Sequence, residues 1–402
     1  MKHQARESRF GFRFCSFLIV LVLGAGAGVN EASAATKVSF LRNATSAFDH
    51  YTSGATAEER AWINDHYWRM RGYPPYFDQA LGWAPPTMFA RNLYAIYRDG
   101  VPDQQLMAEH PDWVLRDAQG QALYIPSGCG DPEPGCPLFA ADVGNPAWRA
   151  WWIDGAQDEL AKGYVGMHVD DVSMSLMVSN GAGQLVRPID PRTGQPMTDA
   201  NWRRYVAEFT EEIRSALPGA DISHNAGQWW TQHSDPYYQR ELNAADMIEL
   251  ERGFNDPGLV AGDGTFGFKT FLKHIDWLHA LGRSLIFEPY DLDAEGRHYA
   301  LASYFMVRKA SDAVASDSRA DPDDWWVGWE ANIGGPKGAR FKTDGYYKRK
   351  FANGIALMNG LGGGNDTIKL SSYYRWKTVG GTTITSVTIG PREGRVLYKF
   401  PR

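Results

Sequence analysis

The stretch NPAWRAWWIDGAQDELAKGYVGMHVDD, residues 145–171, contains a helical pattern followed by an apolar run that ends in two carboxylates. Residues 145–163 have helical spacing, with Asn145 as the N-cap and Pro146 at the first helical position. Residues 164–171 predict a buried strand. A helix that leads directly into a buried strand is part of a βαβ unit, so this stretch predicts a parallel sheet.

The same alternation continues on both sides of this stretch. Strands are predicted at 37–42, 87–97, 164–171, 220–225, 245–251, 283–290 and 324–329. Helices are predicted at 55–70, 145–163, 198–219, 235–244, 268–282 and 295–315. Seven or eight such units in about 300 residues predict an α/β protein built as a (β/α)8 TIM barrel. The alternative, an open doubly wound sheet, usually carries a glycine-rich phosphate turn after an early strand, and the sequence has none.

The sequence changes character near residue 343. Beyond it, short β-type runs such as TTITSVTIG and RVLYKF are separated by turns rich in Gly and Asn. This pattern predicts a small C-terminal antiparallel β domain or extension over 343–402. The catalytic barrel is then expected to occupy 35–342.

The N-terminus predicts export. Four basic residues precede an apolar run of about 16 residues, and the small residues Ala32-Ser33-Ala34 follow it. This is the pattern of a cleaved secretory signal peptide over 1–34. An uncleaved membrane anchor is disfavoured because the run is short and ends in Gly and Ala. We therefore expect a secreted or periplasmic protein that has no membrane association after signal cleavage.

Charge and cysteine content narrow the classes of partner. The formal net charge of −6 and the lack of a basic run argue against nucleic acid as a partner. They argue mildly against a strongly anionic polymer too, unless a local basic groove exists. Cys129 and Cys136 enclose a segment rich in Gly, Pro and acids, which predicts a disulfide that shapes a surface loop. A metal pair is the alternative, but no His or further Cys flanks the two cysteines.

Side chains of a barrel strand alternate between the lumen and the helix layer. In GMHVDD, the apolar Met167 and Val169 suit the helix layer, so His168 and Asp170 are expected to face the lumen. The same alternation in the strands at 220–225, 245–251 and 283–290 extends this set. The polar residues predicted to face the lumen are His168, Asp170, Ser223, Asn225, Glu249, Glu251 and Glu288.

Asp170 and Glu251 fall at the C-terminal ends of their strands, where barrel active sites lie. No equal number of Lys or Arg is expected beside these acids. Two converging carboxylates with nearby aromatic residues fit glycoside hydrolysis, with Asp170 as nucleophile or base and Glu251 as general acid. Asp171 is expected to support Asp170. For Asp171 and Glu249, a salt bridge or a cap in the barrel mouth is an equal alternative.

The predicted substrate is a poly- or oligosaccharide, and no cofactor or metal is expected. Aromatic rings would stack on the apolar faces of sugar rings, whereas Trp148, Trp151 and Trp152 are assigned to helix packing. The residues predicted to bind substrate are His168, Asp171, Asn225, Glu249, Glu288, Trp229, Trp230, Tyr290 and Trp326.

Two other function classes remain open. A non-catalytic carbohydrate-binding barrel would keep a tryptophan-lined cleft, and carboxyl groups more than about 10 Å apart would favour it. A metal-dependent carbohydrate deacetylase could use His168, Asp170, His224 and Asn225. The sequence contains no His-x-His or His-x-x-x-His spacing, so His168 is expected to be a hydrogen-bonding partner beside Asp170.

Several segments together resemble a known family. They are residues 145–172, HPDWVLRDAQG (110–120), NAGQ (225–228), ADMIELERGF (245–254) and YYKRKFANGIALMNG (346–360). In order and content they resemble hypothetical glycosyl hydrolase family 15, distant relatives of the polygalactosaminidase-type barrels. The resemblance implies a TIM barrel that hydrolyses glycosidic bonds, with essential acids at Asp170 and Glu251. His168, Tyr164 and the Cys129–Cys136 loop depart from many relatives.

Overall fold

The structure is a computed structural model that describes residues 38–98, 101–130, 135–226, 228–290, 292–309, 311–316, 320–343 and 345–402. The predicted signal peptide over 1–34 lies outside the described residues. Within them, none of the helices is long and apolar enough to cross a membrane.

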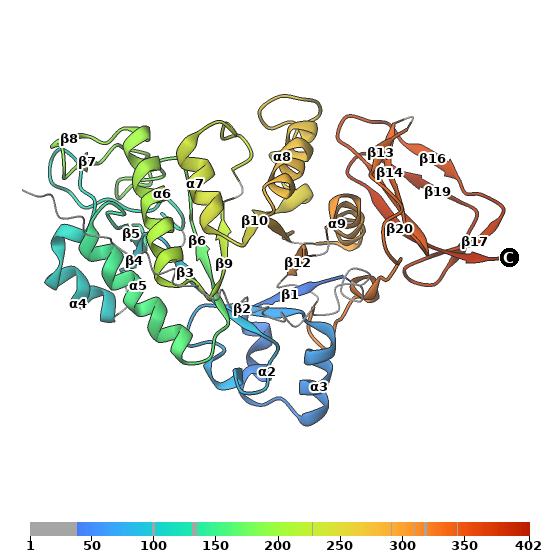
Figure 1. Cartoon of the computed structure of the whole chain (residues 1–402), viewed down its shortest axis with the longest axis horizontal. Helices are drawn as coiled ribbons and strands as arrows, with labels where there is room; N and C mark the ends of the chain where they lie inside the picture. Colours follow the sequence, from blue (N-terminus) through green and yellow to red (C-terminus); the bar gives the residue numbers. More distant parts are fainter. Residues whose placement is uncertain are drawn as a thin grey trace, which may run out of the picture.

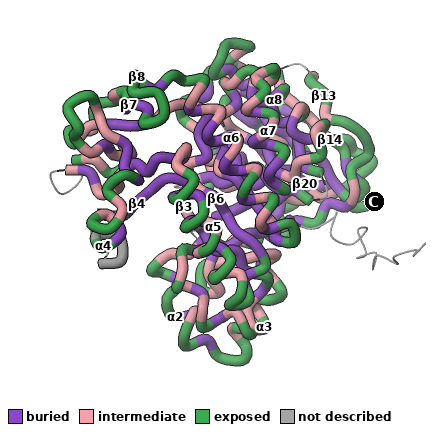
Figure 2. The backbone as a smooth tube through the Cα atoms, turned by 60° about the vertical axis from the view of Figure 1, so that its left-hand side comes forward, coloured by how far each residue is buried: buried purple, intermediate pink, exposed green. Residues whose placement is uncertain are grey.

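Eight parallel strands close into a barrel in the order β1-β12-β11-β10-β9-β6-β3-β2. Their bounds are β1 Phe40–Asn43, β2 Arg69–Gly72, β3 Thr87–Asn92, β6 Gly166–Asp170, β9 Asp221–Asn225, β10 Met247–Glu251, β11 Ser284–Glu288 and β12 Ala313–Ser316. The prediction of a (β/α)8 barrel is therefore confirmed. Figure 2 shows β6 as a buried segment inside the molecule, whereas α3 carries mostly exposed and half-buried residues.

Helices cover the outside of the barrel (Figure 1). Their bounds are α2 Asp49–Ser53, α3 Ala57–His66, α4 Val101–Glu109, α5 Pro146–Ala161, α6 Asp199–Ala216, α7 Pro236–Ala244, α8 Phe268–Ala280 and α9 Ala294–Val307. Short 3-10 turns are η1 Ser46–Phe48, η2 Asp78–Ala80, η3 Pro111–Trp113, η4 Gly253–Asn255 and η5 Val327–Glu330. Asn145 caps α5 as predicted, because its Oδ1 accepts the backbone N–H of Ala147 at 2.9 Å.

The opening glycine of GMHVDD is required by strand packing. A Cβ atom on Gly166 would lie 2.0 Å from the backbone oxygen of Asp221 in the neighbouring strand β9. A backbone atom cannot move away as a flexible side chain can, so only glycine allows β6 and β9 to approach at this point.

Two barrel strands were not predicted from the sequence, and one predicted strand is wrong. Strand β2 directly follows α3, so its first two residues were included in the helical pattern of 55–70, and β12 lies partly inside the helix predicted over 295–315. Residues 324–329 form no strand and include the 3-10 turn η5, where Trp329 is buried against Phe40. The tryptophans of this segment gave it a β-like composition, although their rings pack around a turn.

The predicted strand over 87–97 also differs from the structure. It divides into β3 and β4 (Ala95–Tyr97), and β4 leaves the barrel to pair with β5 (Leu138–Ala140) in an antiparallel ribbon. A second ribbon joins β7 (Ile189–Asp190) to β8 (Gln195–Pro196). Both ribbons belong to the long loops beyond the barrel strands.

The C-terminal β region is present as predicted. A six-stranded sheet has the order β13-β14-β15-β20-β17-β18, and β16 pairs with β19 in a separate ribbon. The bounds are β13 Phe341–Lys342, β14 Tyr346–Lys350, β15 Gly354–Asn359, β16 Asp366–Lys369, β17 Tyr374–Thr378, β18 Thr383–Ile384, β19 Ser386–Ile389 and β20 Gly394–Pro401.

Helix α9 lies between the barrel and the C-terminal sheet (Figure 1). Every residue of α9 from Tyr299 to Val307 is buried, as expected for a helix that packs on two sides. A Cβ atom on Gly394 of β20 would lie 2.6 Å from the Cβ of Ala302, so the sheet approaches the helix closely. Arg349 of β14 donates to the carbonyl oxygens of Phe305, Met306 and Arg308 at the C-terminus of α9.

Candidate active site

The barrel lumen is filled in three layers, and the lowest one is apolar. Leu41, Met88, Met247, Ile286, Ala313 and Ala315 form a buried cluster of lumen-facing side chains. Such packing closes the N-terminal end of the barrel. Polar side chains therefore occupy only the two layers nearer the C-terminal ends of the strands.

The middle layer is organised around Arg71 of β2. Its guanidinium donates to Glu288 Oε2 at 2.9 Å, to Asn43 Oδ1 at 3.0 Å, and to Glu249 Oε2. Asn43 in turn donates to the other oxygen of Glu288. One arginine balances one carboxylate charge, and burial raises the pKa of Glu249 well above its ordinary value. Arg71 is thus the cation that holds the two buried acids, Glu249 and Glu288, in place.

His168 belongs to the middle layer and does not lie beside Asp170, so that expectation is wrong. Its Nδ1 lies 2.9 Å from Ser223 Oγ and 3.2 Å from Arg71 Nη1, and its Nε2 lies 3.5 Å from Glu249 Oε1. Burial, followed by the charge of Arg71, lowers the pKa of His168 well below its ordinary value. Its imidazole is therefore neutral. Residues 168 and 170 face the same lumen at different heights, which explains their different partners.

The upper layer brings Asp170 and Glu251 together. Asn225 of β9 lies between them, and its Nδ2 donates to Asp170 Oδ1 at 3.0 Å and to Glu251 Oε2 at 3.2 Å. Asp170 accepts two further hydrogen bonds, from Tyr73 Oη at 2.8 Å and from the backbone N–H of Asp171 at 2.9 Å. Both acids are partly exposed. The predicted convergence of the two carboxylates is therefore present.

Asp171 supports the arrangement through its backbone and side chain. Its φ of 55° is in the left-handed region, where a non-glycine residue is strained. In this conformation its N–H reaches Asp170, and its Oδ2 accepts a hydrogen bond of 2.6 Å from Asn92 Nδ2. Burial, with a further contribution from the charge of Asp170, raises the pKa of Asp171 to about 6.

Two cavities meet at these acids. One has a volume of about 560 Å³ and the other of about 530 Å³. Four residues line both cavities, and these are Ser127, Asp171, Asn225 and Glu251. Asp171 and Glu251 therefore lie where the two spaces join, and Asp170 lines the first of them. This position suits a reaction on a bond that has substrate on both sides.

The matching protein family can now be stated. The model of hypothetical glycosyl hydrolase family 15 matches residues 90–355, about two thirds of the chain. The chain belongs to hypothetical glycosyl hydrolase family 15. The resemblance found in the sequence is thereby confirmed, and the family assigns to this barrel the hydrolysis of O-glycosidic bonds. The match includes Asp170, Asn225 and Glu251, whereas Arg71 and Tyr73 precede it.

The chain also matches solved structures at low sequence identity. The glycoside hydrolase domain of PelA from Pseudomonas aeruginosa is 15% identical over 70% of this chain and 94% of its own, with a TM-score of 0.40. The isomalto-dextranase of Arthrobacter globiformis T6 is 12% identical over 92% and 73%, with a TM-score of 0.46. The GH27 β-L-arabinopyranosidase of Geobacillus stearothermophilus is 10% identical over 93% and 99%, with a TM-score of 0.48. Among curated proteins, no match to the chain is found.

The tryptophans and tyrosine predicted to bind substrate take different positions in this family member. Tyr290 lines the first cavity, and Trp229 and Trp230 line the second. Trp229 is buried, whereas Trp230 is 40% exposed and is the more accessible ring. Trp326 is not among the residues that line either cavity, and it packs edge-on against Trp329.

Several residues of the site were not predicted from the sequence. Arg71 lies in the unrecognised strand β2, and Tyr73 follows directly after that strand. Arg71 is a basic residue among the lumen acids, and it pairs with Glu249 and Glu288 of the middle layer, whereas the expectation about Lys and Arg concerned Asp170 and Glu251. Alternation would have placed Asn92 in the lumen, because it ends β3 in the register of Asp170.

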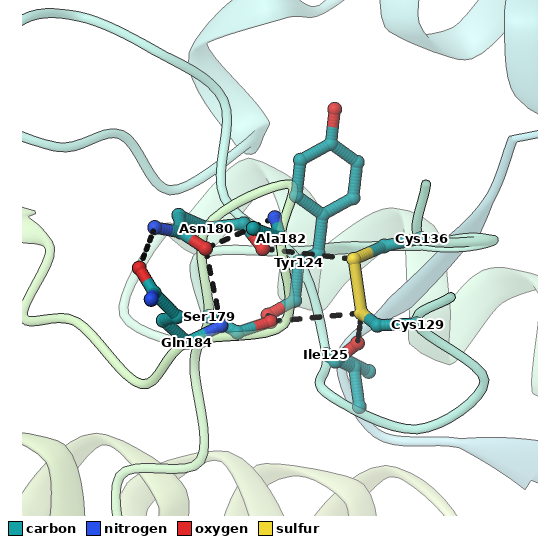
Figure 3. The surroundings of a disulfide bond; sticks show 8 residues. All are labelled: Tyr124, Ile125, Cys129, Cys136, Ser179, Asn180, Ala182 and Gln184. Atoms are coloured by element: carbon teal, nitrogen blue, oxygen red, sulfur yellow. Dashed lines mark hydrogen bonds between the residues drawn. A yellow bond between two sulfur atoms is a disulfide. The ribbon is translucent and has the colours of Figure 1, made fainter. Parts of the chain in front are cut away.

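The predicted Cys129–Cys136 disulfide is present (Figure 3). It lies beside two other segments, with Cys129 Sγ 3.4 Å from the carbonyl oxygen of Ile125 and Cys136 Sγ 3.6 Å from that of Asn180. The same loop presents Ser127 to both cavities. The disulfide therefore fixes a loop that forms part of the cleft wall.

The residues considered for a metal site do not gather into one. His224 is completely buried and faces the helix layer, where its Nδ1 lies 2.7 Å from Glu241 Oε1. Across the described ranges, no group of three or more His, Cys, Asp or Glu side chains is arranged to hold a metal ion.

Proposed function

We propose that the protein is an exported glycoside hydrolase that cleaves a polysaccharide, with Asp170 as nucleophile and Glu251 as general acid and base. The observation that carries this proposal is the bridge made by Asn225. A single amide nitrogen donates to both acids, so the two carboxylates face one another across the join of the two cavities. Export is supported by the disulfide, which is typical of oxidising compartments, and by the N-terminal sequence pattern.

The different surroundings of the two acids support this division of roles. Asp170 accepts three hydrogen bonds that fix its orientation, which suits a nucleophile that must meet the anomeric carbon in line. Glu251 accepts only the bond from Asn225 within the described part of the chain. Its carboxyl group is thus freer to donate a proton to the leaving oxygen. After the glycosyl–Asp170 ester forms, Glu251 would take a proton from the water that hydrolyses it.

The separation of the acids favours retention of anomeric configuration. Asp170 Oδ1 and Glu251 Oε2 lie 3.0 Å and 3.2 Å from the same nitrogen. These two oxygen atoms are therefore at most about 6 Å apart, in keeping with the ~5.5 Å between the carboxyl groups of retaining enzymes. This is also well within the ~10 Å beyond which a binding-only barrel would be favoured.

The shape of the cleft favours an extended substrate. Each cavity alone is in the size range of a small-ligand site, and together they extend on both sides of the acids. Tyr73 and Tyr97 line one side, and Trp230 and Met177 line the other, all of them partly exposed. Such surfaces suit the apolar faces of successive sugar rings. We therefore infer a polymer or long oligomer as substrate.

The test uses the chain from residue 35 onward and a panel of bacterial and plant polysaccharides. Release of reducing ends by the wild type is expected to disappear in Asp170→Asn and Glu251→Gln. The matched control is Asp154→Asn, which changes an exposed acid on α5 and should leave activity unchanged. The first-formed anomer, followed by proton NMR, should keep the substrate's configuration. Activity that survives both changes would overturn the assignment of the acids.

The two alternatives predict different results from the same samples. A binding barrel would retain affinity for a polysaccharide in the wild type and both variants while releasing no sugar. A deacetylase would release acetate and lose that activity to a chelator. Hydrolysis that persists with chelator present would support the proposal over both.

A further inference from the structure

The two parts of the chain carry opposite charge. Residues 341–402 contain eleven Lys and Arg residues against three Asp and Glu residues. Residues 1–340 contain 30 against 44. The C-terminal sheet region is therefore basic, although the whole chain has a net charge of −6. This is the local basic surface that would reverse the sequence-based argument against an anionic polymer.

Four lysines gather around the turn between β14 and β15. Lys348 and Lys350 lie two residues apart in β14 and so share a face of the sheet. The backbone N–H of Lys337 donates to the carbonyl oxygen of Lys350 at 2.8 Å. Lys399 of β20 reaches the same turn, since its Nζ donates to the carbonyl oxygen of Phe351 at 3.0 Å. The cluster is therefore built from three separate segments.

Among the described residues, these four lysines have no acidic partner. Within the part of the chain that the structure describes, none of them forms an ion pair, although many lysines of the barrel do. Burial lowers the pKa of Lys399, and the charges of Lys337 and Lys350 lower it further. Burial, followed by the charge of Lys350, also lowers the pKa of Lys348. The sheet thus holds a repulsive group of positive charges that an external anion would relieve.

Exposed aromatic rings stand among these charges. Phe341 is 43% exposed, and Lys350 Nζ lies 5.7 Å from the centre of its ring. Tyr374 is 38% exposed, and Lys399 Nζ lies 5.5 Å from its ring centre. Each pair places an ammonium group next to an apolar ring. A ligand that combines a negative charge with an apolar face would satisfy both features.

We propose that this face of the C-terminal sheet, the lysine face, binds an acidic polysaccharide that carries carboxylates on its sugar rings. Lys337, Lys348, Lys350 and Lys399 would contact the carboxylates, and Phe341 and Tyr374 would contact the C–H faces of the rings. Duplex nucleic acid would use the charges alone, because its base faces are stacked inside the helix. An acidic polysaccharide uses both, and the same chain belongs to a family whose substrates are sugars.

The lysine face would act separately from the cleft, because β14 and β20 belong to the C-terminal sheet, which α9 separates from the barrel (Figure 1). It could hold the enzyme on a polymer matrix while the barrel cleaves the same or another chain. The proposal rests on family membership and on the C-terminal sheet, and it does not depend on which carboxylate performs the hydrolysis.

The test measures binding to polygalacturonate by affinity electrophoresis and titration calorimetry. The chain from residue 35 onward is used with Asp170→Asn, so that cleavage does not interfere and failure of the proposed hydrolysis leaves this result unaffected. We expect retardation by polygalacturonate that weakens as NaCl is raised, and none by neutral dextran. Lys337→Gln/Lys350→Gln, both at exposed positions, should weaken binding by about tenfold at low ionic strength.

The matched control is Lys269→Gln/Lys273→Gln, which removes two positive charges from α8 on the barrel. It should bind polygalacturonate as the parent does. Tyr374→Ala should weaken binding several-fold without changing its salt dependence, with circular dichroism confirming the fold. Three results would each overturn the proposal. They are an equal loss of polygalacturonate affinity in the two double-lysine variants, no binding at low salt, or tighter binding to single-stranded polythymidylate than to polygalacturonate.

Discussion

The middle and upper layers of the barrel lumen contain the same residue types in different electrostatic settings. Glu249 and Glu251 stand two residues apart on β10 and face the same lumen. Glu249 is buried and paired with Arg71, whereas Glu251 is partly exposed and, within the described residues, accepts a hydrogen bond only from the neutral amide of Asn225. A carboxylate held by a cation stabilises the barrel, and one held by an amide keeps the freedom to react. The partner that the fold supplies therefore decides the role of the acid.

The largest expected difference between the layers is in catalysis. Asp170→Asn or Glu251→Gln should lower kcat by at least about 10³-fold, because each removes a group that forms or breaks a bond. The free energy of unfolding should change by less than about 1 kcal/mol, since both acids are partly exposed. Steady-state kinetics and urea unfolding of the same preparations measure the two quantities. A large loss of stability would assign these acids to the scaffold.

Substitution in the middle layer should change the free energy of unfolding. Arg71→Met leaves Glu249 and Glu288 buried without their cation and should lower the free energy of unfolding by about 3–5 kcal/mol. Urea unfolding followed by tryptophan fluorescence checks this value. The triple variant with Glu249→Gln and Glu288→Gln, which removes the buried charges as well, should recover part of the loss. Unchanged stability in Arg71→Met would show that the layer does not hold the barrel together.

Asp171 provides an intermediate effect that depends on pH. Its pKa rises from 3.8 to about 6 on folding, so the folded state binds the proton more tightly than the unfolded state. Wild-type stability should therefore fall as pH rises from about 4 to about 6, by up to about 3 kcal/mol. Asp171→Asn removes this dependence and should be more stable than wild type above pH 6 and equal to it near pH 4. Thermal unfolding from pH 4 to pH 7 measures the difference, and parallel curves would contradict it.

The smallest expected effect concerns the orientation of Asp170. Tyr73→Phe removes one of three hydrogen bonds to this carboxylate, worth about 1 kcal/mol, and should lower kcat by about fivefold with little change in KM. Tyr290→Phe is the comparison, since Tyr290 lines the same cavity and no hydrogen bond of its hydroxyl occurs within the described residues. If the two variants change kcat equally, Tyr73 contributes to the cavity wall and not to the orientation of Asp170.

Alternation along single strands predicted the lumen-facing acids correctly. His168, Asp170, Glu249, Glu251 and Glu288 all line the first cavity, as their period-two spacing indicated. The prediction failed where periodicity was interrupted. Strand β2 has four residues and follows a helix with only Tyr67 and Trp68 between them, so its first residues, Arg69 and Met70, continued the helical pattern. Because strand β2 was not predicted, Arg71, the cation of the middle layer, was not predicted either.

The sequence by itself determined which side chains face the lumen, because the pleat of a strand sets that property residue by residue. It also determined the disulfide, the alternation that makes a barrel, and the two acids most suited to catalysis. Only the tertiary structure decided which acids lie level with Arg71, that Asn225 bridges the other two, and that lysines from three segments meet on one sheet. These properties depend on the stagger of strands far apart in the chain, and no local pattern encodes that stagger.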